Sequence, residues 1–189
     1  MYDIAVIGAG PAGASAAIFT ARANKQTVMF DSDQSITKRA WIENHYGVEQ
    51  VEGPALVDTG KRQAANAGAE IVDARVTGVE KLESGFRIQT ETGHYDARQV
   101  VLATGLWTDV AEWLGVQTKP ATEPRIKTVV EVDAAGHTSV TGVWAAGTVA
   151  GVSVHTIVTA GDGARVAINV ISELNGERYV DHDVLNPSN

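Results

Sequence analysis

The chain has 189 residues, 15 of them basic and 23 acidic, and it contains no cysteine. Its formal net charge of −8 disfavours nucleic acid or an anionic membrane as a partner. The lack of cysteine excludes disulfides, thiolate metal sites and a dithiol redox couple within these residues. No stretch approaches the roughly 20 apolar residues needed to cross a bilayer, and the first residues carry no basic leader pattern. We therefore expect one cytoplasmic domain, residues 1–189.

The first third of the sequence predicts a strand–helix–strand unit. Residues 2–8 form an apolar run that ends in glycine, residues 13–24 are rich in alanine, and residues 27–31 form a second apolar run. This order is typical of a parallel βαβ crossover. Residues 31–47 show no clean period and are expected to be loop with one helical turn. Residues 53–68 begin with Gly-Pro and end with Gly, which predicts a helix.

Three β-like runs follow, at residues 69–82, 85–92 and 94–104, with glycines at the two turns between them. The last run is apolar at consecutive positions 100–103, as in a strand buried in a parallel sheet. The remaining predictions are a short helix at 107–114, a linker at 118–125, strands at 126–133 and 142–145, a helix at 154–174 and a loose tail after Val180.

Gly8 to Gly13 form a G-x-G-x-x-G pattern between the first strand and the first helix. Its glycines allow a tight turn at Gly8, close backbone approach to a pyrophosphate at Gly10 and close helix–strand packing at Gly13. The start of the helix adds free N–H groups and a partial positive charge against the phosphates. Asp31 ends the second strand, where a carboxylate can bind a ribose diol. The pattern predicts a dinucleotide site, and by itself it does not separate FAD from NAD.

Five segments resemble those of the thioredoxin reductase-like, FAD-dependent pyridine nucleotide-disulphide oxidoreductases. They run in the family's order and cover nearly the whole chain. They are GAGPAGASAAIFTAR (8–22, the first fingerprint), IENHYG (42–47), VVLATG (100–105, the ATG motif), TSVTGVWAAGTVAG (138–151, the second FAD segment) and TAGDGARVA (159–167).

The resemblance implies an α/β fold, a Rossmann-like FAD-binding domain with a central parallel sheet, flanking helices and an additional β-meander. The family inserts a nicotinamide-binding domain, which carries its C-x-x-C dithiol, between the ATG motif and the second FAD segment. Here fewer than forty residues join Gly105 to Val143, too few for several crossover units of about 30 residues each. We therefore expect the FAD-binding half alone, with a short connection around 106–141.

The resemblance also implies the residues that contact FAD. Asp31 would bind the adenosine ribose, Val76 would present backbone to the adenine, and Asn44 would lie near the flavin. The start of the last helix would face the pyrimidine edge of the flavin, where a helix N-terminus stabilises the negative charge of the reduced ring. The implied cofactor-binding residues are Gly8, Gly10, Pro11, Ala12, Gly13, Asp31, Ser35, Asn44, Val76, Thr104, Gly105, Gly147, Thr148, His155, Thr156 and Ile157.

The roles of Thr148 and His155 stay open. Thr148 stands where the family has an acid that binds the ribityl chain, and threonine keeps the hydrogen bond without the charge. His155 fits either a capping, solvent-facing histidine or a flavin contact that tunes the potential or passes a proton. Gly161 and Gly163, inside the last predicted helix, indicate close packing on a neighbouring element. We assign no metal site and no catalytic residue.

The first functional hypothesis is an FAD-dependent oxidoreductase without its own NAD(P)H domain or redox dithiol. Its electron donor would be NAD(P)H at the open flavin face or a reduced carrier protein such as ferredoxin, and thioredoxin-disulfide reductase activity is not expected from this chain alone. A homodimer is expected, because loss of a domain exposes apolar surface. The four tryptophans are mostly core or interface candidates, and Trp107 and Trp113, near the place of the missing domain, would cover the flavin or a dimer seam. The alternatives are a non-catalytic flavin-binding module, as a redox sensor or half of a split reductase, and an NAD-binding dehydrogenase.

Overall fold

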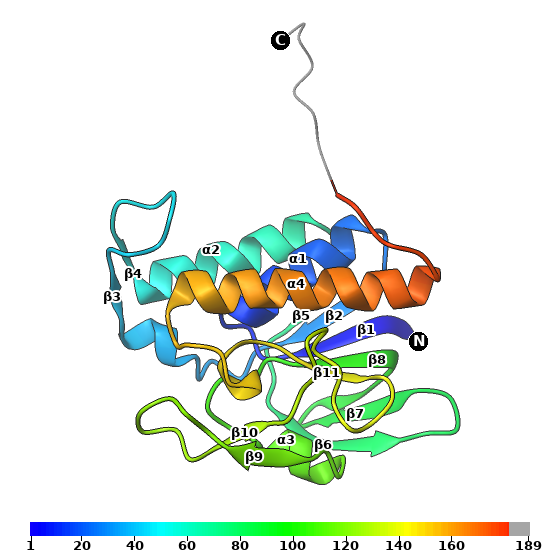
Figure 1. The fold of residues 1–189 in the computed structure, drawn as a ribbon. Helices are drawn as coiled ribbons and strands as arrows, with labels where there is room; N and C mark the ends of the chain where they lie inside the picture. Colours follow the sequence, from blue (N-terminus) through cyan, green and yellow to red (C-terminus); the bar gives the residue numbers. More distant parts are fainter. Residues whose placement is uncertain (182–189) are drawn as a thin grey trace, which may run out of the picture.

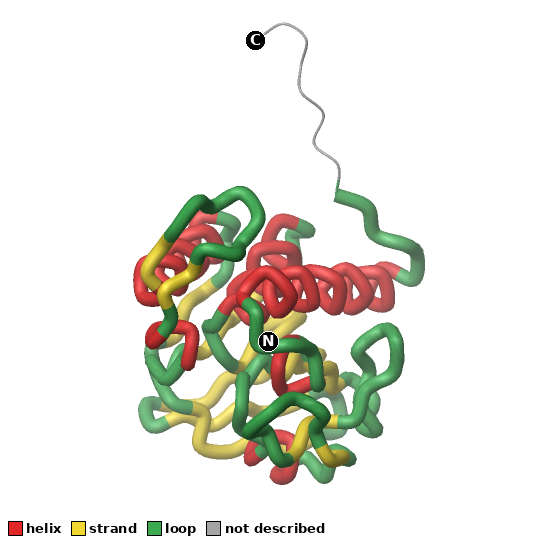
Figure 2. The backbone as a smooth tube through the Cα atoms, turned by 60° about the vertical axis from the view of Figure 1, so that its left-hand side comes forward, coloured by secondary structure: helices red, strands yellow, loops and turns green. Residues whose placement is uncertain are grey.

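The computed structural model describes residues 1–181 of the chain. The prediction of a loose tail after Val180 lies almost entirely outside these residues. The three long helices lie together on one side of the strands (Figures 1 and 2). The mixed α/β fold with a central, mostly parallel sheet is confirmed. Within residues 1–181, no helix is long and apolar enough to cross a membrane.

The centre of the fold is a run of parallel strands in the order β5-β2-β1-β8-β11. The long strand β8 pairs with β1 through its second half and places its last residues beside β11. β1, β2 and the second half of β8 are apolar runs recognised in the sequence, as strands buried on both faces require. The bounds of the parallel strands are β1 Tyr2–Ile7, β2 Thr27–Phe30, β5 Glu70–Val72, β8 Gly93–Leu102 and β11 Val143–Ala145.

The sheet separates two hydrophobic cores. Along β1, Ile4 and Val6 belong to the core under the helices, whereas Ala5 and Ile7 belong to the core on the opposite face. This alternation follows from the two-residue period of a strand, because successive side chains point to opposite faces. The helices of the first core are α1 (Pro11–Arg22), α2 (Gly53–Asn66) and α4 (Thr156–Asn175).

Helices α1 and α4 approach each other closely at one glycine. A Cβ atom on Gly163 would lie 2.0 Å from the carbonyl oxygen of Ala12, so no larger residue fits without movement. The packing predicted for Gly163 is therefore confirmed. The same prediction is wrong for Gly161. This residue lies on the exposed side of α4, and a Cβ atom there would have no atom within 4 Å in the described part of the chain.

The second core is covered by an antiparallel meander formed by β6 (Val76–Lys81), β7 (Phe86–Thr90) and the first half of β8. The sequence predicts a single run at 69–82, but the structure divides it into β5 and β6. The division arises because β5 pairs with β2 at the sheet edge while β6 pairs with β7, so the chain must turn between them. The Ala74 N–H closes this turn on the carbonyl of Val72, at 2.9 Å.

Residues 103–142 connect β8 to β11. They contain the short helix α3 (Asp109–Trp113) and a hairpin of β9 (Thr118–Pro120) and β10 (Thr128–Val130). The linker predicted at 118–125 is thus partly wrong, because its first residues pair with β10 as a fully exposed strand that ends at its proline. The smaller elements elsewhere are η1 (Ile36–Arg39), β3 (Trp41–Ile42), β4 (Val51–Glu52) and η2 (Gly147–Ala150).

Candidate functional site

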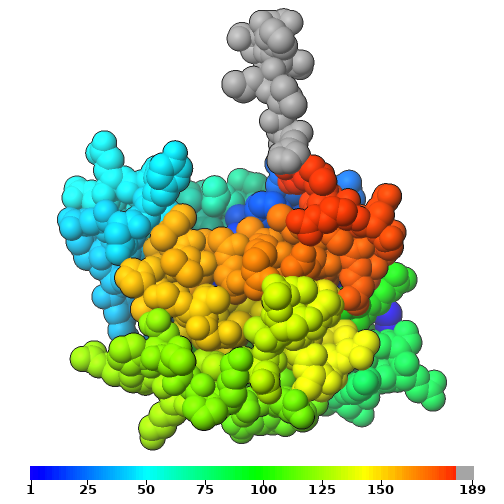
Figure 3. Space-filling view, viewed as in Figure 1, coloured from blue at the N-terminus to red at the C-terminus, as the bar shows by residue number. Residues whose placement is uncertain are grey.

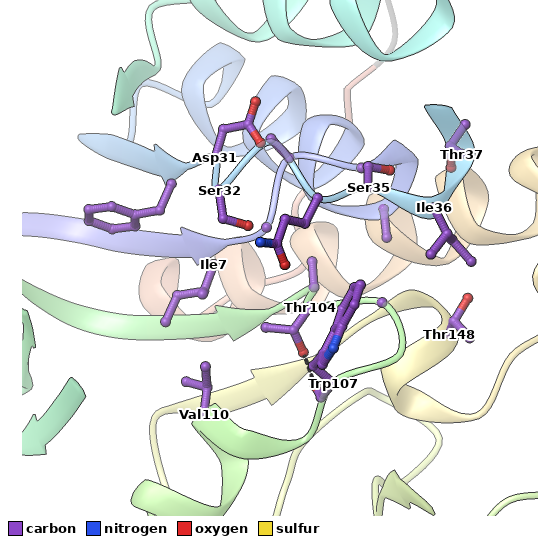
Figure 4. A pocket seen from close by; sticks show the side chains of 18 of the residues that line it. Ile7, Asp31, Ser32, Ser35, Ile36, Thr37, Thr104, Trp107, Val110 and Thr148 are labelled. Carbon is purple, nitrogen blue, oxygen red and sulfur yellow. Dashed lines mark hydrogen bonds between the residues drawn. The ribbon is translucent and has the colours of Figure 1, made fainter. Parts of the chain in front are cut away.

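A cleft opens where the parallel strands end. Its floor includes Ile7 at the end of β1, Phe30 at the end of β2, Ala103 just after β8 and Ala146 just after β11. In α/β folds, ligands bind at the carboxyl ends of the parallel strands, in the crevice formed by the loops that follow these strands. Figure 4 shows the side chains that surround the cleft.

Ten of the sixteen expected cofactor-binding residues line this cleft, and they come from segments spread over the whole chain. They are Gly8, Gly10, Pro11, Ala12, Asp31, Ser35, Val76, Thr104, Gly105 and Thr148. The other six lie beside or behind it, and their contacts with a cofactor stay predictions. They are Gly13, Asn44, Gly147, His155, Thr156 and Ile157.

The glycines of the first turn have different tasks. Gly8 has a φ of +110°, and a Cβ there would lie 2.3 Å from the carbonyl oxygen of Ala103. A Cβ on Gly13 would lie 1.8 Å from the carbonyl oxygen of Gly8, so both positions are fixed by packing. Gly10 has an ordinary φ of −72° and meets only the Ser35 side chain, at 3.1 Å. The missing side chain of Gly10 therefore serves the cleft rather than the fold.

The N-terminus of α1 borders the cleft. Gly10 is its N-cap, no side chain caps it, and its first turn contains no acidic residue. Pro11 occupies the first helical position, where the missing N–H costs nothing. The remaining first-turn N–H groups are thus free for a ligand, and the helix dipole makes the position favourable for a phosphate.

Asp31 follows β2 and is buried at the same edge. Its Oδ1 accepts the N–H of Asp33 at 2.8 Å. Its Oδ2 accepts no hydrogen bond of normal geometry within residues 1–181, although the Nζ atom of Lys61 lies 2.6 Å away. Lys61 comes from α2 and also contacts Asp73, at 2.9 Å. The sequence analysis missed Lys61, because nothing in the pattern of α2 tells which of its cations faces Asp31.

The opposite wall is built by η2. Thr148 is buried there, and its hydroxyl has no hydrogen-bond partner in the part of the chain that the structure describes. The N–H of the preceding Gly147 donates to Oδ2 of Asp162, at 2.7 Å. Oδ1 of Asp162 accepts from Arg165, at 2.8 Å. The sequence analysis also missed Asp162. Arg165 balances the charge of this carboxylate, and its hydrogen bond with the Gly147 N–H holds the wall in place.

The start of α4 stands next to this wall. Val154 and Thr159 line the cleft, whereas His155, the N-cap, is exposed and pairs through Nδ1 with Ser153 Oγ at 2.8 Å. The Thr156 hydroxyl pairs with Nδ1 of His45, at 3.0 Å, and so ties the 42–48 segment to α4. This contact brings the segment of the exposed Asn44 to the helix without placing Asn44 in the cleft.

The loop after β8 covers the middle of the cleft. The Thr104 hydroxyl donates to the carbonyl oxygen of Trp107, at 2.5 Å, and the indole of Trp107 lies among the lining side chains (Figure 4). The other exposed tryptophan of this region, Trp113, does not line the cleft. Figure 3 shows the surface here, with the cyan 40–52 segment and the yellow-green 105–127 segment on either side of the start of α4.

Comparison with known proteins places these features in a family. The family model of the pyridine nucleotide-disulphide oxidoreductases matches residues 2–129. The thioredoxin reductase of Rickettsia conorii is 37% identical over 121 residues, which are 61% of this chain and 38% of that protein. The thioredoxin reductase of Treponema pallidum is 39% identical over 108 residues, 55% of this chain and 35% of that protein. The chain thus matches little more than a third of the length of these relatives.

Two solved structures have the same fold. A thioredoxin reductase from Gloeobacter violaceus gives a TM-score of 0.86 at 20% identity, over 97% of this chain and 99% of that one. A ferredoxin-flavin thioredoxin reductase from Clostridium acetobutylicum gives 0.74 at 19% identity, over 93% and 98%. At such identities the likeness concerns the fold alone, whereas the family model covers most of the sequence. The chain belongs to the pyridine nucleotide-disulphide oxidoreductase family.

Proposed function

We propose that the chain binds FAD in the cleft and acts as an oxidoreductase that receives electrons from an external donor. The observation that carries the proposal is the meeting of two distant segments across one cleft. The first is the glycine turn with the uncapped start of α1, and the second is the η2 wall with Thr148. A dinucleotide motif alone would not require the second segment, so the pair favours FAD over an NAD-binding dehydrogenase.

The polar groups of the cleft fit the parts of FAD. The start of α1 would hold the pyrophosphate, close to the bare backbone of Gly10. The Asp31 carboxylate, whose Oδ1 accepts only the Asp33 N–H within residues 1–181, has capacity left for a ribose hydroxyl. The free Thr148 hydroxyl can pair with a ribityl hydroxyl. When bound, FAD supplies the redox chemistry, and the protein supplies binding, orientation and electrostatics.

An external donor is favoured by the connection between β8 and β11. Residues 106–142 hold α3 and the β9–β10 hairpin, which leaves no length for a nicotinamide-binding domain at that place. The donor would be NAD(P)H at the open side of the cleft or a reduced carrier protein such as ferredoxin. The chain contains no cysteine, so it cannot reduce a disulfide by dithiol exchange on its own.

A second candidate is a non-catalytic flavin-binding module, a redox sensor or one half of a split reductase. The observation in its favour is Thr148, a neutral side chain buried in the cleft wall at the position where the family's second FAD segment has an acid. Such a module would bind FAD and show no turnover with any donor.

The absorption spectrum of the purified protein tests the proposal. The protein should be yellow, or become yellow after incubation with FAD and removal of free ligand. Gly10→Val should bind little FAD while remaining folded, because its new side chain enters the cleft and meets only Ser35. Gly161→Ala, a glycine substitution at a site without neighbours, is the matched control. A protein that stays colourless would refute FAD binding.

Anaerobic addition of donors separates the two candidates. Bleaching by NADH, NADPH or reduced ferredoxin, followed by turnover with an acceptor, supports the oxidoreductase. A flavin that is reduced by dithionite but by none of these donors supports the binding module.

The homodimer and the cytoplasmic location belong to the same proposal. Exposed apolar side chains such as Trp113, Ile157 and Val158 support an interface between copies. Light scattering coupled to size-exclusion chromatography would give twice the monomer mass of 19.9 kDa if the dimer forms.

A further inference from the structure

We propose that Lys61 positions the Asp31 carboxylate for the ribose of a bound adenine nucleotide, and thereby gives the cleft its discrimination for the ribose 2′-hydroxyl. The inference deepens the proposed function, since it concerns the adenosine end of the same cleft. It does not depend on which redox reaction follows.

The register of two neighbouring strands brings two carboxylates together. β2 and β5 are parallel, with Phe30 opposite Val72, so Asp31 and Asp73 are the next residues on adjacent strand ends. The Asp31 N–H continues the pairing to the carbonyl of Val72, at 2.9 Å. Two carboxylates side by side repel each other. The ammonium group of Lys61 lies between them, 2.6 Å from Asp31 and 2.9 Å from Asp73.

The two carboxylates differ in exposure. The Asp73 side chain is 76% exposed and can be solvated by water, whereas the Asp31 side chain is 6% exposed and depends on its protein neighbours. Those neighbours are the Asp33 N–H at Oδ1 and Lys61 at Oδ2. Lys61 is thus the group that balances the buried charge. Removal of one partner of such a pair leaves an uncompensated charge inside the protein.

Asp31 keeps acceptor capacity toward the cleft on its other oxygen. Asp31 lines the cleft, but its Oδ2 is fully buried and faces Lys61, at 2.6 Å. Oδ1 accepts only the Asp33 N–H within residues 1–181, and an ionised carboxylate oxygen has more than one acceptor direction. Lys61 can therefore hold Oδ2 from α2 while a hydroxyl group donates to Oδ1 from the cleft. A hydrogen bond to a charged acceptor is stronger than one between neutral groups. A bond from the ribose 2′-hydroxyl to Asp31 would therefore increase the affinity for the nucleotide.

Lys61 itself is held in the charged state. Burial alone would lower its pKa, but the contacts with Asp31 and Asp73 raise the pKa of Lys61 overall. The helix α2 is also anchored by the buried Val57 and Ala64 and by Gly53 against the backbone of Thr37. Its docking therefore does not depend on Lys61 alone, and the ammonium group is held directly against Asp31.

Calorimetric titration with ADP and with 2′-deoxy-ADP tests the inference without any redox assay. The wild-type protein should prefer ADP by roughly ten-fold, as a hydrogen bond to a charged group predicts. Lys61→Met should reduce this ratio to about two-fold or less, whereas Lys61→Arg should retain most of it. Arg62→Met is the matched control, because it removes a cation from the next position of α2, where the side chain contacts Thr59. Its ratio should match the wild type.

Asp31→Asn and the double variant keep the test decisive if Lys61→Met is unstable, because Asp31→Asn removes the buried charge that Lys61 balances. Asp31→Asn should abolish the preference, and adding Lys61→Met to it should change the ratio no further, because Lys61 acts through Asp31. Equal weakening of both ligands by Lys61→Met would show a merely structural role and overturn the inference, as would a wild-type protein without the preference. If the protein prefers ADP to 2′-deoxy-ADP but does not bind FAD, the proposed function fails and the inference stands.

Discussion

The two ends of the cleft present different chemistry. At the charged end, the Asp31 carboxylate is fixed between the Asp33 N–H and Lys61. The opposite end is called the packed end here. Its wall is held from behind by Asp162, but the surface that it presents to the cleft is neutral and consists of Thr148, Trp107 and Val154. Directional contacts favour one chemical group, whereas packing tolerates related shapes. From this difference we expect the cleft to select the group bound beside Asp31 more strictly than the group bound at its packed end.

The α1–α4 contact joins the two ends, so the largest expected effect comes from breaking it. Gly163→Ala would place a Cβ 2.0 Å from the Ala12 carbonyl and push α4 away from the glycine turn. We expect a loss of about 3 kcal/mol of unfolding free energy together with loss of FAD binding. Urea unfolding measures the first and absorbance titration the second.

Gly161→Ala is the control, two residues away on the exposed side of the same helix. It should stabilise the protein by about 0.5–1 kcal/mol, because alanine is the better helix former. Equal effects of the two substitutions would mean that α4 is not held against α1 as described.

A smaller effect is expected at the packed end of the cleft. Trp107→Ala removes an indole that lies in the cleft, and it should weaken FAD binding by about 1 kcal/mol, roughly five-fold, through lost aromatic contact. Trp113→Ala removes a tryptophan of similar exposure that does not line the cleft, and the dissociation constant should not change. Tighter binding by Trp107→Ala would instead identify Trp107 as a side chain that blocks the cleft.

Thr148 tests whether the packed end tolerates a charge. Thr148→Asp should keep or tighten FAD affinity, since a carboxylate is the stronger acceptor for a ribityl hydroxyl. Thr148→Val should weaken binding by about 1 kcal/mol or less, the value of one neutral hydrogen bond. Fluorescence titration of both variants measures the change, and a clear loss of affinity in Thr148→Asp would mean that this wall faces another part of the ligand.

The smallest effect is expected away from both ends, at His137, which lies against the ring of Trp144. Its side chain bonds Glu173 through Nε2 and Asp133 through Nδ1, each at 2.9 Å. Burial alone would lower its pKa, but these two bonds raise the pKa of His137 overall. Burial alone would raise the pKa of Asp133, but hydrogen bonds from the backbone and ring of His137 lower it overall.

The sign of the pH dependence follows from these shifts. The stabilisation from His137 is fully present below its unfolded pKa of 6.5 and is lost as the pH rises through the higher folded value. The stabilisation from Asp133 is present above 3.8 and is lost as the pH falls through the lower folded value. Urea midpoints of wild type and His137→Phe should therefore differ more at pH 5.5 than at pH 9. A difference that grows with rising pH would contradict this assignment, and His94→Gln, on the exposed part of β8, is the control.

Much of the frame of the cleft could be predicted from local pattern. The apolar runs of β1 and β2, the glycine turn and the start of α1 are short-range features, so the sequence predicts that Gly8, Gly10 and Asp31 follow strand ends, where they line the cleft. The division of the 69–82 run into β5 and β6 could not be predicted. It depends on the partners β2 and β7, which lie far away in the sequence.

By itself, the sequence determined the α/β class, the glycine turn before α1 and the absence of thiol chemistry, because each follows from residue type and spacing over a few positions. Only the tertiary structure decided which distant groups meet: Lys61 beside Asp31, Asp162 beneath Gly147, Gly163 against Ala12 and Trp107 inside the cleft. Such pairs form when helices and loops pack against the sheet. The local sequence around each residue does not indicate which distant residue it will contact.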